Sequence, residues 1–276
     1  MEPIETFAKG AHTSSTVMKD TKLAAKIIEY YEPARQMRQF CFDYKIDKLS
    51  TVLPKDPGST DMAVELAEMS DIPLARTSME SVPLVVVKNG TRFFMSDEAE
   101  IEDTFGTLYE REAKEAGERM ARKEDYDISS VLQGGSYESF AASHVGELNT
   151  FDLARAKALL RTHEFEATDL LINPEQWADI EGEALLQNMQ YTSEGAKYSG
   201  KNASTVMGLN VTLINKITAG TALVMCKPAQ PVWYVYNPTT KTEPKREEGK
   251  GRGALITAYW KPVVMRATAI VKITSC

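Results

Sequence analysis

A helix-like apolar stripe between residues 96 and 134 is the feature that most constrains the fold. The stripe consists of Ile101, Phe105, Leu108, Ala113, Ala116, Met120, Ile128 and Val131. Ser96 and the acidic residues after it are typical of a helix start, because a serine oxygen accepts a backbone N–H and carboxylates favour the positive end of the helix dipole. Gly134 and Gly135 mark the end. The pattern predicts one helix of roughly 35 residues, about 50 Å long, against an average of about 12 residues.

The other face of this predicted helix carries both signs of charge between Glu110 and Lys123. Residues four apart on a helix are neighbours, so the pattern favours ion pairs on a solvated surface. Two carboxylate pairs, Asp97–Glu98 and Glu124–Asp125, could carry out acid–base chemistry if they were buried in a cleft. On a helix of mixed charge such pairs are more typical of the solvated face, and we interpret both in that way.

A β-rich excursion at residues 48–95 precedes the helix. Prolines and a glycine punctuate residues 46–75, where no helical period survives. Val82–Met95 then places valines and aromatic residues on both sides of Asn89-Gly90, a dipeptide that favours a tight hairpin turn. A segment of this length without its own core must lie against another surface, either the rest of the chain or a neighbouring chain.

The remaining segments mix helices and strands in an order typical of α+β or α/β proteins, and we predict α+β. The polar residues 1–20 predict an extended arm, and residues 21–47 predict one or two short helices that break at Pro33. Further along we predict a helix from a Thr150 cap to about His163, a strand at Thr168–Ile172, a helix that starts at Asn173-Pro174, a polar loop at 188–204, strands at Leu209–Ile214, Thr221–Cys226 and Val232–Tyr236, a hydrophilic span at Asn237–Gly253, and a strand at Ala254–Ile273 with a bend at Pro262.

The composition argues against several classes of protein. The 276 residues are 43% hydrophobic and carry a formal net charge of −7. This composition is typical of a globular protein. The negative net charge argues against general nucleic-acid binding, which relies on Lys and Arg to neutralise phosphates. A protein with this charge can still enclose DNA without binding it tightly. We also expect neither a membrane span nor a secretory signal, because the sequence has no run of about 20 apolar residues and no basic, apolar leader.

Groups that could carry chemistry are scattered along the sequence. The three cysteines, Cys41, Cys226 and Cys276, form no CxxC pair and are odd in number, so we predict reduced thiols, two partly buried and one on a tail. The three histidines, His12, His144 and His163, lack metal-ligand spacing. We therefore assign no catalytic, cofactor-binding or metal-binding residue.

Two further motifs have a plain and a functional interpretation. The run Gly249–Gly253 is glycine-rich and basic but lacks the spacing of a phosphate loop, so we interpret it as a flexible turn, with an anion contact as the alternative. The aromatic run Trp233–Tyr236 could stack on a base or a sugar. Its alternation favours packing of a strand into the core instead.

Several motifs, in their order along the chain, closely resemble the major capsid proteins of tailed bacteriophages. They are Met95–Asp103 and Ala116–Asp125 in the predicted long helix, Thr150–Leu153, Leu170–Trp177, Met207–Val211, Thr218–Val224, Thr257–Trp260 and Arg266–Val271. Each motif alone is weak, but together they span residues 21–273. The first two are similar to the spine helix of that family, the middle four to its A-domain, and the last two to its closing P-domain strand.

The resemblance implies the tailed-phage capsid fold, with a long spine helix, an extended N-arm, an E-loop β-hairpin and a mixed α/β A-domain. The implied segments are an N-terminal arm at 1–20, a helical part of the P-domain at 21–47, the E-loop at 48–95, the spine helix of the P-domain at 96–145, the A-domain and a following loop at 146–253, and a C-terminal P-domain strand at 254–276. The E-loop is then expected to lie on a neighbouring subunit.

The function implied is that of a major capsid protein in the virion, without enzymatic activity. Copies would assemble in the host cytoplasm as pentamers and hexamers into an icosahedral shell around double-stranded DNA. The implied partners are the chain itself, packaged DNA that is not bound by sequence, and portal, scaffolding and decoration proteins. No membrane partner is implied. The alternatives are an encapsulin-like nanocompartment shell, which shares the fold, and a soluble acid–base hydrolase, which would need a buried carboxylate cluster.

Overall fold

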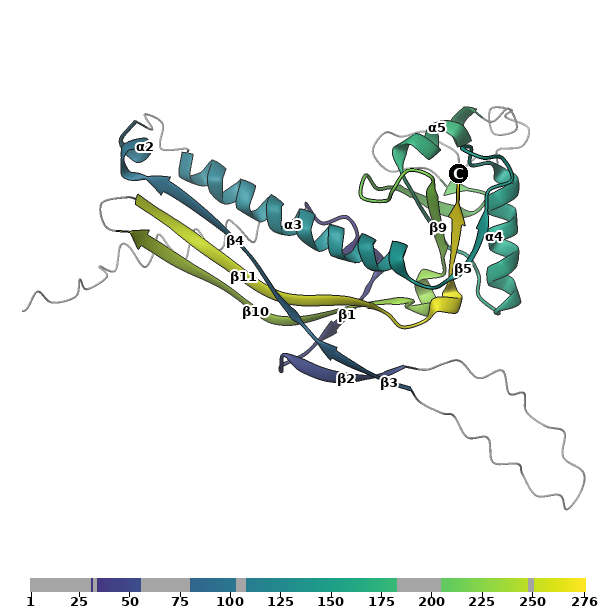
Figure 1. The fold of residues 1–276 in the computed structure, drawn as a ribbon, viewed down its shortest axis with the longest axis horizontal. Coiled ribbons are helices and arrows are strands. Elements are labelled where there is room, and N and C mark those ends of the chain that lie inside the picture. Colours follow the sequence, from purple (N-terminus) through teal and green to yellow (C-terminus); the bar gives the residue numbers. More distant parts are fainter. Residues whose placement is uncertain (1–30, 32–33, 56–79, 103–107, 183–204, 248–250) are drawn as a thin grey trace, which may run out of the picture. The chain divides into compact units, whose positions relative to one another are not determined.

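The computed structural model describes residues 31, 34–55, 80–102, 108–182, 205–247 and 251–276. Its mixture of helices and strands confirms the predicted α+β class (Figure 1). The chain forms two compact units. Unit 1 consists of Met1–Arg35, Lys88–Glu124 and Thr239–Ala258, and unit 2 of Gln36–Val87, Asp125–Pro238 and Tyr259–Cys276. The predicted arm at 1–20 and the polar loop at 188–204 lie outside the described residues.

The predicted long helix is helical on both sides of a short gap in the described residues. Helix α2 spans Asp97–Glu102 and helix α3 spans Leu108–Gly134. Residues 103–107 lie outside the described residues, so the continuity of a single helix stays a prediction. The predicted start is confirmed, because the Ser96 Oγ accepts a hydrogen bond from the backbone N–H of Ala99 at 3.2 Å. Helix α3 has 27 residues and therefore extends about 40 Å at 1.5 Å per residue.

A four-stranded sheet accompanies these helices, in the order β1-β10-β11-β4. Its strands are β1 (Phe42–Lys45), β10 (Val232–Glu247), β11 (Gly251–Val264) and β4 (Val87–Ser96). In unit 1, Ala113 and Ala116 of α3 are buried with Phe93 of β4 and with Ala254 and Ile256 of β11. The two alanines leave room for the helix backbone to lie close to the strands, which Figure 1 shows running beside α3.

Three sequence predictions fail in this sheet. The hydrophilic span at Asn237–Gly253 is mostly strand, since β10 and β11 extend through most of it. The sequence of this span does not show the alternation of apolar and polar residues that predicts a strand. The reason is that the side chains of residues 238–241 are all exposed. Residues 42–45, predicted as helical, form β1, which pairs in parallel with β10.

The third failure concerns Asn89-Gly90, which lies inside β4 and forms no hairpin turn. A Cβ atom at Gly90 would lie 2.7 Å from the backbone oxygen of Ile256. The glycine is thus required for the close approach of two backbones. Gly253 on β11 has the same role, because a Cβ there would collide with the backbone oxygen of Phe93.

Unit 2 contains a six-stranded sheet in the order β5-β12-β9-β6-β8-β7. The strands are β5 (Glu138–Ala141), β12 (Ile270–Thr274), β9 (Thr221–Met225), β6 (Asp169–Ile172), β8 (Leu209–Leu213) and β7 (Thr205–Val206). The predicted strand at Ala254–Ile273 is therefore two strands, β11 and β12, in different sheets. Strand β12 pairs in parallel with β5 and antiparallel with β9.

Two helices complete unit 2. Helix α4 (Thr150–Thr162) buries Leu153, Ala156 and Leu160 in the cluster formed by the sheet. Its cap is Asn149, whose side chain accepts the N–H of Asp152, and not Thr150 as predicted. Helix α5 (Pro174–Gly182) starts as predicted, with the Asn173 Oδ1 accepting the N–H of Glu175 at 3.1 Å.

Two parts of the predicted β-rich segment 48–95 form a two-stranded antiparallel hairpin in unit 2. Strand β2 (Ser50–Lys55) pairs antiparallel with β3 (Glu80–Val85), with Ser50 opposite Val85 and Val52 opposite Pro83. Residues 56–79 between the two strands lie outside the described residues. Leu53 and Leu84 are buried in a second cluster of unit 2 together with Val86 and Val235.

We expect the substitution Gly253→Ala to lower the free energy of unfolding by about 2 kcal/mol or more, because the new methyl group has no space against the backbone of β4. Gly134→Ala is the matched control, since a Cβ there would meet nothing within 4 Å. That substitution should leave stability unchanged or raise it slightly. Urea unfolding of the unassembled subunit measures both variants, and equal midpoints would contradict the packing described for Gly253.

Candidate interaction surfaces

The structure does not gather the predicted chemical groups into one site. His163 lies 3.0 Å from the Glu138 carboxylate, His144 is exposed, and His12 is outside the described residues. Among the residues that the structure describes, no three His, Cys, Asp or Glu side chains are grouped as metal ligands would be. Within the same residues, no helix combines the length and apolar character needed to cross a bilayer.

A serine, a histidine and an aspartate do meet at the start of α4. The buried Asp152 carboxylate accepts hydrogen bonds from the N–H and the hydroxyl of Ser143, at 3.0 and 3.2 Å. Asn149 lies beside them, with its Nδ2 2.8 Å from the Ser143 Oγ and 3.3 Å from the Nδ1 of His144. The aspartate thus binds the serine and does not orient the imidazole, as a nucleophilic triad would require. The arrangement fastens the loop that precedes α4.

The interpretation of Glu124 and Asp125 as solvated was wrong, because both side chains are buried. In unit 1 the Glu124 carboxylate accepts a hydrogen bond from the Tyr31 hydroxyl and lies 3.9 Å from the Arg35 guanidinium. Arg35 also lies over the Tyr31 ring. A signal was available in the sequence, since Glu124 is four residues after Met120 and therefore on the apolar side of the helix.

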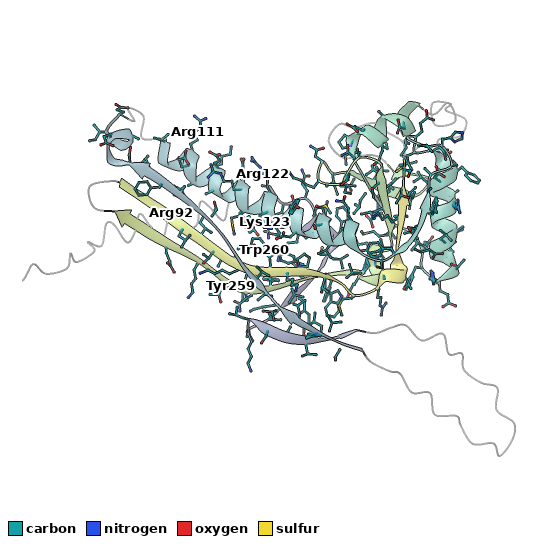
Figure 2. All side chains as sticks on the ribbon, viewed as in Figure 1. Arg92, Arg111, Arg122, Lys123, Tyr259 and Trp260 are labelled. Carbon is teal, nitrogen blue, oxygen red and sulfur yellow. The ribbon has the colours of Figure 1, made fainter. Side chains whose placement is uncertain are left out.

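Asp125 performs a similar role in unit 2. Its carboxylate accepts the backbone N–H groups of Gln36, at 3.1 Å, and Met37, at 2.9 Å. These bonds fix the point where the chain enters unit 2, and Met37 is fully buried there. Two residues further along α3, the Asp127 carboxylate accepts the indole N–H of Trp260 at 3.1 Å. Figure 2 labels Trp260 on β11, and this indole is also buried.

The solvated face predicted for the long helix is confirmed in its middle part. Arg119 pairs with Glu115 at 2.6 Å and Arg122 with Glu118 at 3.0 Å, each four residues apart. Hydrogen bonding to Arg119 lowers the pKa of Glu115. Arg111 is also exposed, and Figure 2 shows Arg111 and Arg122 on α3. Exposed pairs of this kind contribute little to stability.

The aromatic run on β10 packs into unit 2, as the core interpretation predicted. Tyr234 and Val235 are buried, while Trp233 is half-buried and stacks on Tyr44 with ring centroids 5.2 Å apart. On the other side of the strand, the Arg38 guanidinium lies 4.6 Å from the Tyr234 ring and 4.7 Å from the Tyr236 ring. Arg38 also forms a two-bond pair with Asp43.

The three cysteines are reduced, as predicted, but Cys276 is not on a tail. Its Sγ lies 2.9 Å from the side-chain nitrogen of Gln176 and is buried, and burial raises its pKa to about 11. Burial likewise raises the pKa of Cys41 to about 12. The basic glycine run Gly249–Gly253 was predicted to be a flexible turn. Residues 251–253 are part of strand β11 instead, while residues 249 and 250 lie outside the described residues.

The base of the β2–β3 hairpin presents an apolar surface to solvent. Because residues opposite each other in an antiparallel pair share a face, Val52, Pro83 and Val85 point the same way. All three are exposed, Val52 at 61% and Val85 at 59%, and the nearby Val87 at 53%. Leu53 and Leu84 on the opposite face are buried. A two-stranded hairpin that is apolar on both faces is typical of a segment covered by another molecule.

Comparison with known proteins places these surfaces in context. A family model described as "Phage capsid protein" matches residues 80–273. No curated protein sequence matches the chain. Solved structures with a similar fold include the capsid of the cyanophage P-SCSP1u, with a TM-score of 0.65 and 13% identity over 85% of this chain and 86% of that chain. The capsid of an empty GTA particle gives a TM-score of 0.64 and 12% identity over 99% and 95%.

An encapsulin has a similar fold as well. The holo-SrpI encapsulin complex from Synechococcus elongatus PCC 7942 gives a TM-score of 0.62 and 9% identity, over 98% of this chain and 92% of that chain. At these identities the solved structures establish the fold alone. The family match covers most of the chain and carries the functional information.

We expect Asp125→Ala to destabilise the subunit by about 2–4 kcal/mol, because the buried backbone N–H of Met37 and the partly buried N–H of Gln36 lose their acceptor. Glu115→Ala removes a carboxylate from the exposed face of the same helix and should leave the unfolding midpoint within experimental error. Urea unfolding followed by circular dichroism compares the two variants. A loss for Asp125→Ala no larger than that of the control would show that this carboxylate does not fasten the chain.

Proposed function

Because the chain belongs to the phage capsid protein family and is a major capsid protein that forms a shell, we propose that its copies assemble as pentamers and hexamers into an icosahedral shell around double-stranded DNA. The observation that carries this proposal is the family match over residues 80–273. The protein is then a component of the virion, and assembly takes place in the host cytoplasm. Its role is structural, and its buried polar clusters hold loops and chain segments in place through hydrogen bonds.

We assign the segments of the chain in the terms of this family. Residues 1–20 are the N-arm, 21–47 the first part of the P-domain, 48–95 the E-loop, and 96–145 the spine helix region. Residues 146–253 are the A-domain and the segment that follows it, which is largely β10 and the start of β11, and 254–276 begin in the P-domain. The pairing of β12 with β9 adds residues 270–274 to the sheet of the A-domain.

The E-loop lies on a neighbouring subunit. The exposed apolar face around Val52 and Val85 supports this, because hydrophobic burial of such a face contributes roughly 25 cal/mol per Å². Each contact of this kind between two subunits can be weak. In a closed shell every subunit makes several of them, and the second and later contacts form at high effective concentration.

The packaged DNA is enclosed without sequence recognition. A net charge of −7 supports this, since a wall that repels phosphate lets DNA slide past it. Portal and scaffolding proteins are the expected assembly partners, and decoration proteins a possible addition. The alternative of an encapsulin-like compartment rests on the fold shared with the Synechococcus encapsulin, and a protein cargo in place of DNA would distinguish it.

Negative-stain electron microscopy of the purified chain tests the proposal. We expect closed, uniform shells or rings of five and six subunits, formed by the chain alone or after scaffolding protein or lysate from the native source is added. Only small featureless particles under both conditions would contradict a shell subunit. Nucleic acid inside shells purified from the native source separates the virus from a compartment with protein cargo.

The double substitution Val52→Asp and Val85→Asp should abolish shells while the subunit still folds, because two charges then occupy a face that is buried only on assembly. Val145→Asp is the matched control, since Val145 is 89% exposed and lies outside the hairpin. Sedimentation measures the assembled fraction, and circular dichroism reports the fold. Wild-type assembly of the double variant would show that this face of the hairpin is not a subunit contact.

A further inference from the structure

A groove runs along the outer side of α4 in unit 2. Its volume is about 490 Å³, and its lining residues are Ala154, Lys157, Ala158, Arg161, Thr162 and Met207. Ala154 and Ala158 are one helical turn apart and both exposed, so the floor of the groove is a stretch of α4 with small side chains. Another helix can therefore approach the backbone of α4 closely at this position.

One wall of the groove is held in a strained conformation. Met207 lies in the turn between β7 and β8 with φ of 52° and is 41% exposed, although a flexible apolar side chain is more often buried. The Lys157 Nζ donates a hydrogen bond to the Met207 backbone oxygen at 2.6 Å and fixes this turn against α4. Phe151, one turn before Ala154, is 67% exposed and extends the apolar surface.

The exposed charges that α4 itself contributes have one sign. Apart from the buried Asp152, the charged residues of α4 are all basic: Arg155, Lys157 and Arg161. Arg155 is engaged over the Phe140 ring, and Arg161 is exposed at the groove. The groove is therefore apolar and small-sided along its floor and positively charged along its rim.

Helix α5 presents the complementary surface. It carries acidic residues and no basic residue. Glu175 and Ala178 are exposed, and Asp179 is half-buried, so one side of the helix combines a small side chain with carboxylates. Ile180 on the other side is anchored in the core of unit 2, which holds the acidic face in a fixed orientation. On each helix an alanine lies three positions from a charged residue, Ala158 from Arg161 on α4 and Ala178 from Glu175 on α5.

We propose that the α4 groove of one copy receives the acidic face of α5 from the next copy. The inference rests on the proposed shell function and names the contact between adjacent subunits of a ring. Because the two surfaces are different and belong to the same compact unit, the contact is head-to-tail. Contacts of this kind generate a ring when the rotation from one copy to the next closes. Arg161 pairs with Glu175, while the alanines Ala158 and Ala178 set the distance between the helices.

Charge reversal tests the pairing. Arg161→Glu and Glu175→Lys should each lower the fraction of protein in rings and shells on the order of tenfold, because like charges then face each other. The combination R161E/E175K should restore assembly to within about threefold of the wild type. Lys216→Glu, the same change of charge on an exposed loop residue between β8 and β9, is the control and should assemble normally. Sedimentation measures assembly, and circular dichroism confirms that each variant folds.

The outcomes separate the inference from the function on which it rests. If the wild type forms shells and both single variants assemble as well, the α4–α5 contact is wrong while the shell function stands. Loss of assembly in the folded double variant as well would show that the two residues do not face each other, which also overturns the contact. If the wild type forms neither rings nor shells with or without its native scaffold, the shell function itself fails.

A disulfide trap provides a test that does not depend on weakened assembly. The double variant Ala158→Cys and Ala178→Cys, oxidised after assembly, should give a ladder of linked subunits on a non-reducing gel. Each single variant should remain monomeric on the same gel, which controls for linkage through the native Cys41. Assembled double variant without a ladder would overturn the contact, and so would a ladder formed equally by either single variant.

Discussion

Much of the packing within each compact unit depends on helix α3, which supplies residues to both. Its first half contributes Ala113 and Ala116 to the core of unit 1. At its other end, Gln133 binds the backbone of Lys216 and Thr218 in unit 2, and Lys272 donates to the Gln133 carbonyl at 2.8 Å. A cation at this position also interacts favourably with the negative end of the helix. Within each unit, α3 therefore binds segments that are far apart in the sequence.

Two buried carboxylates on α3 attach the chain near its N-terminal end to this helix, Glu124 within unit 1 and Asp125 within unit 2. Burying a charge costs free energy unless hydrogen bonds or an opposite charge compensate it. Glu124 obtains both from Tyr31 and Arg35, and Asp125 obtains two backbone N–H groups. An apolar residue at either position would leave the polar groups of the incoming chain without acceptors. These two residues are thus used for positioning, in the same way as Asp152 at the loop before α4.

Sequence reasoning succeeded where the determinants are local. The Ser96 cap, the Asn173-Pro174 helix start and the glycine end of α3 depend on neighbouring residues, and each is present in the structure. It failed where distant segments decide the outcome. Asn89-Gly90 has the composition of a turn, but the backbone of Ile256 sets its environment. The carboxylates of Glu124 and Asp125 appeared solvated because their partners, at residues 31–37, are almost ninety positions away. The interaction surfaces were predictable only as a region, since exposure of Val52 and burial of Leu53 depend on register.

A subunit of a shell need not bury all of its surface, and three surfaces of different character are exposed among the described residues. The outer face of the β2–β3 hairpin is aliphatic, the α4 groove is small-sided and basic, and α5 is acidic. These differences matter for assembly. An aliphatic face associates without strict direction, whereas opposite charges on two helices suppress wrong partners and set the register of the contact. The hairpin face contributes binding free energy, and the charged helices fix the orientation of each contact. Many weak contacts can close one defined shell only when both properties are present.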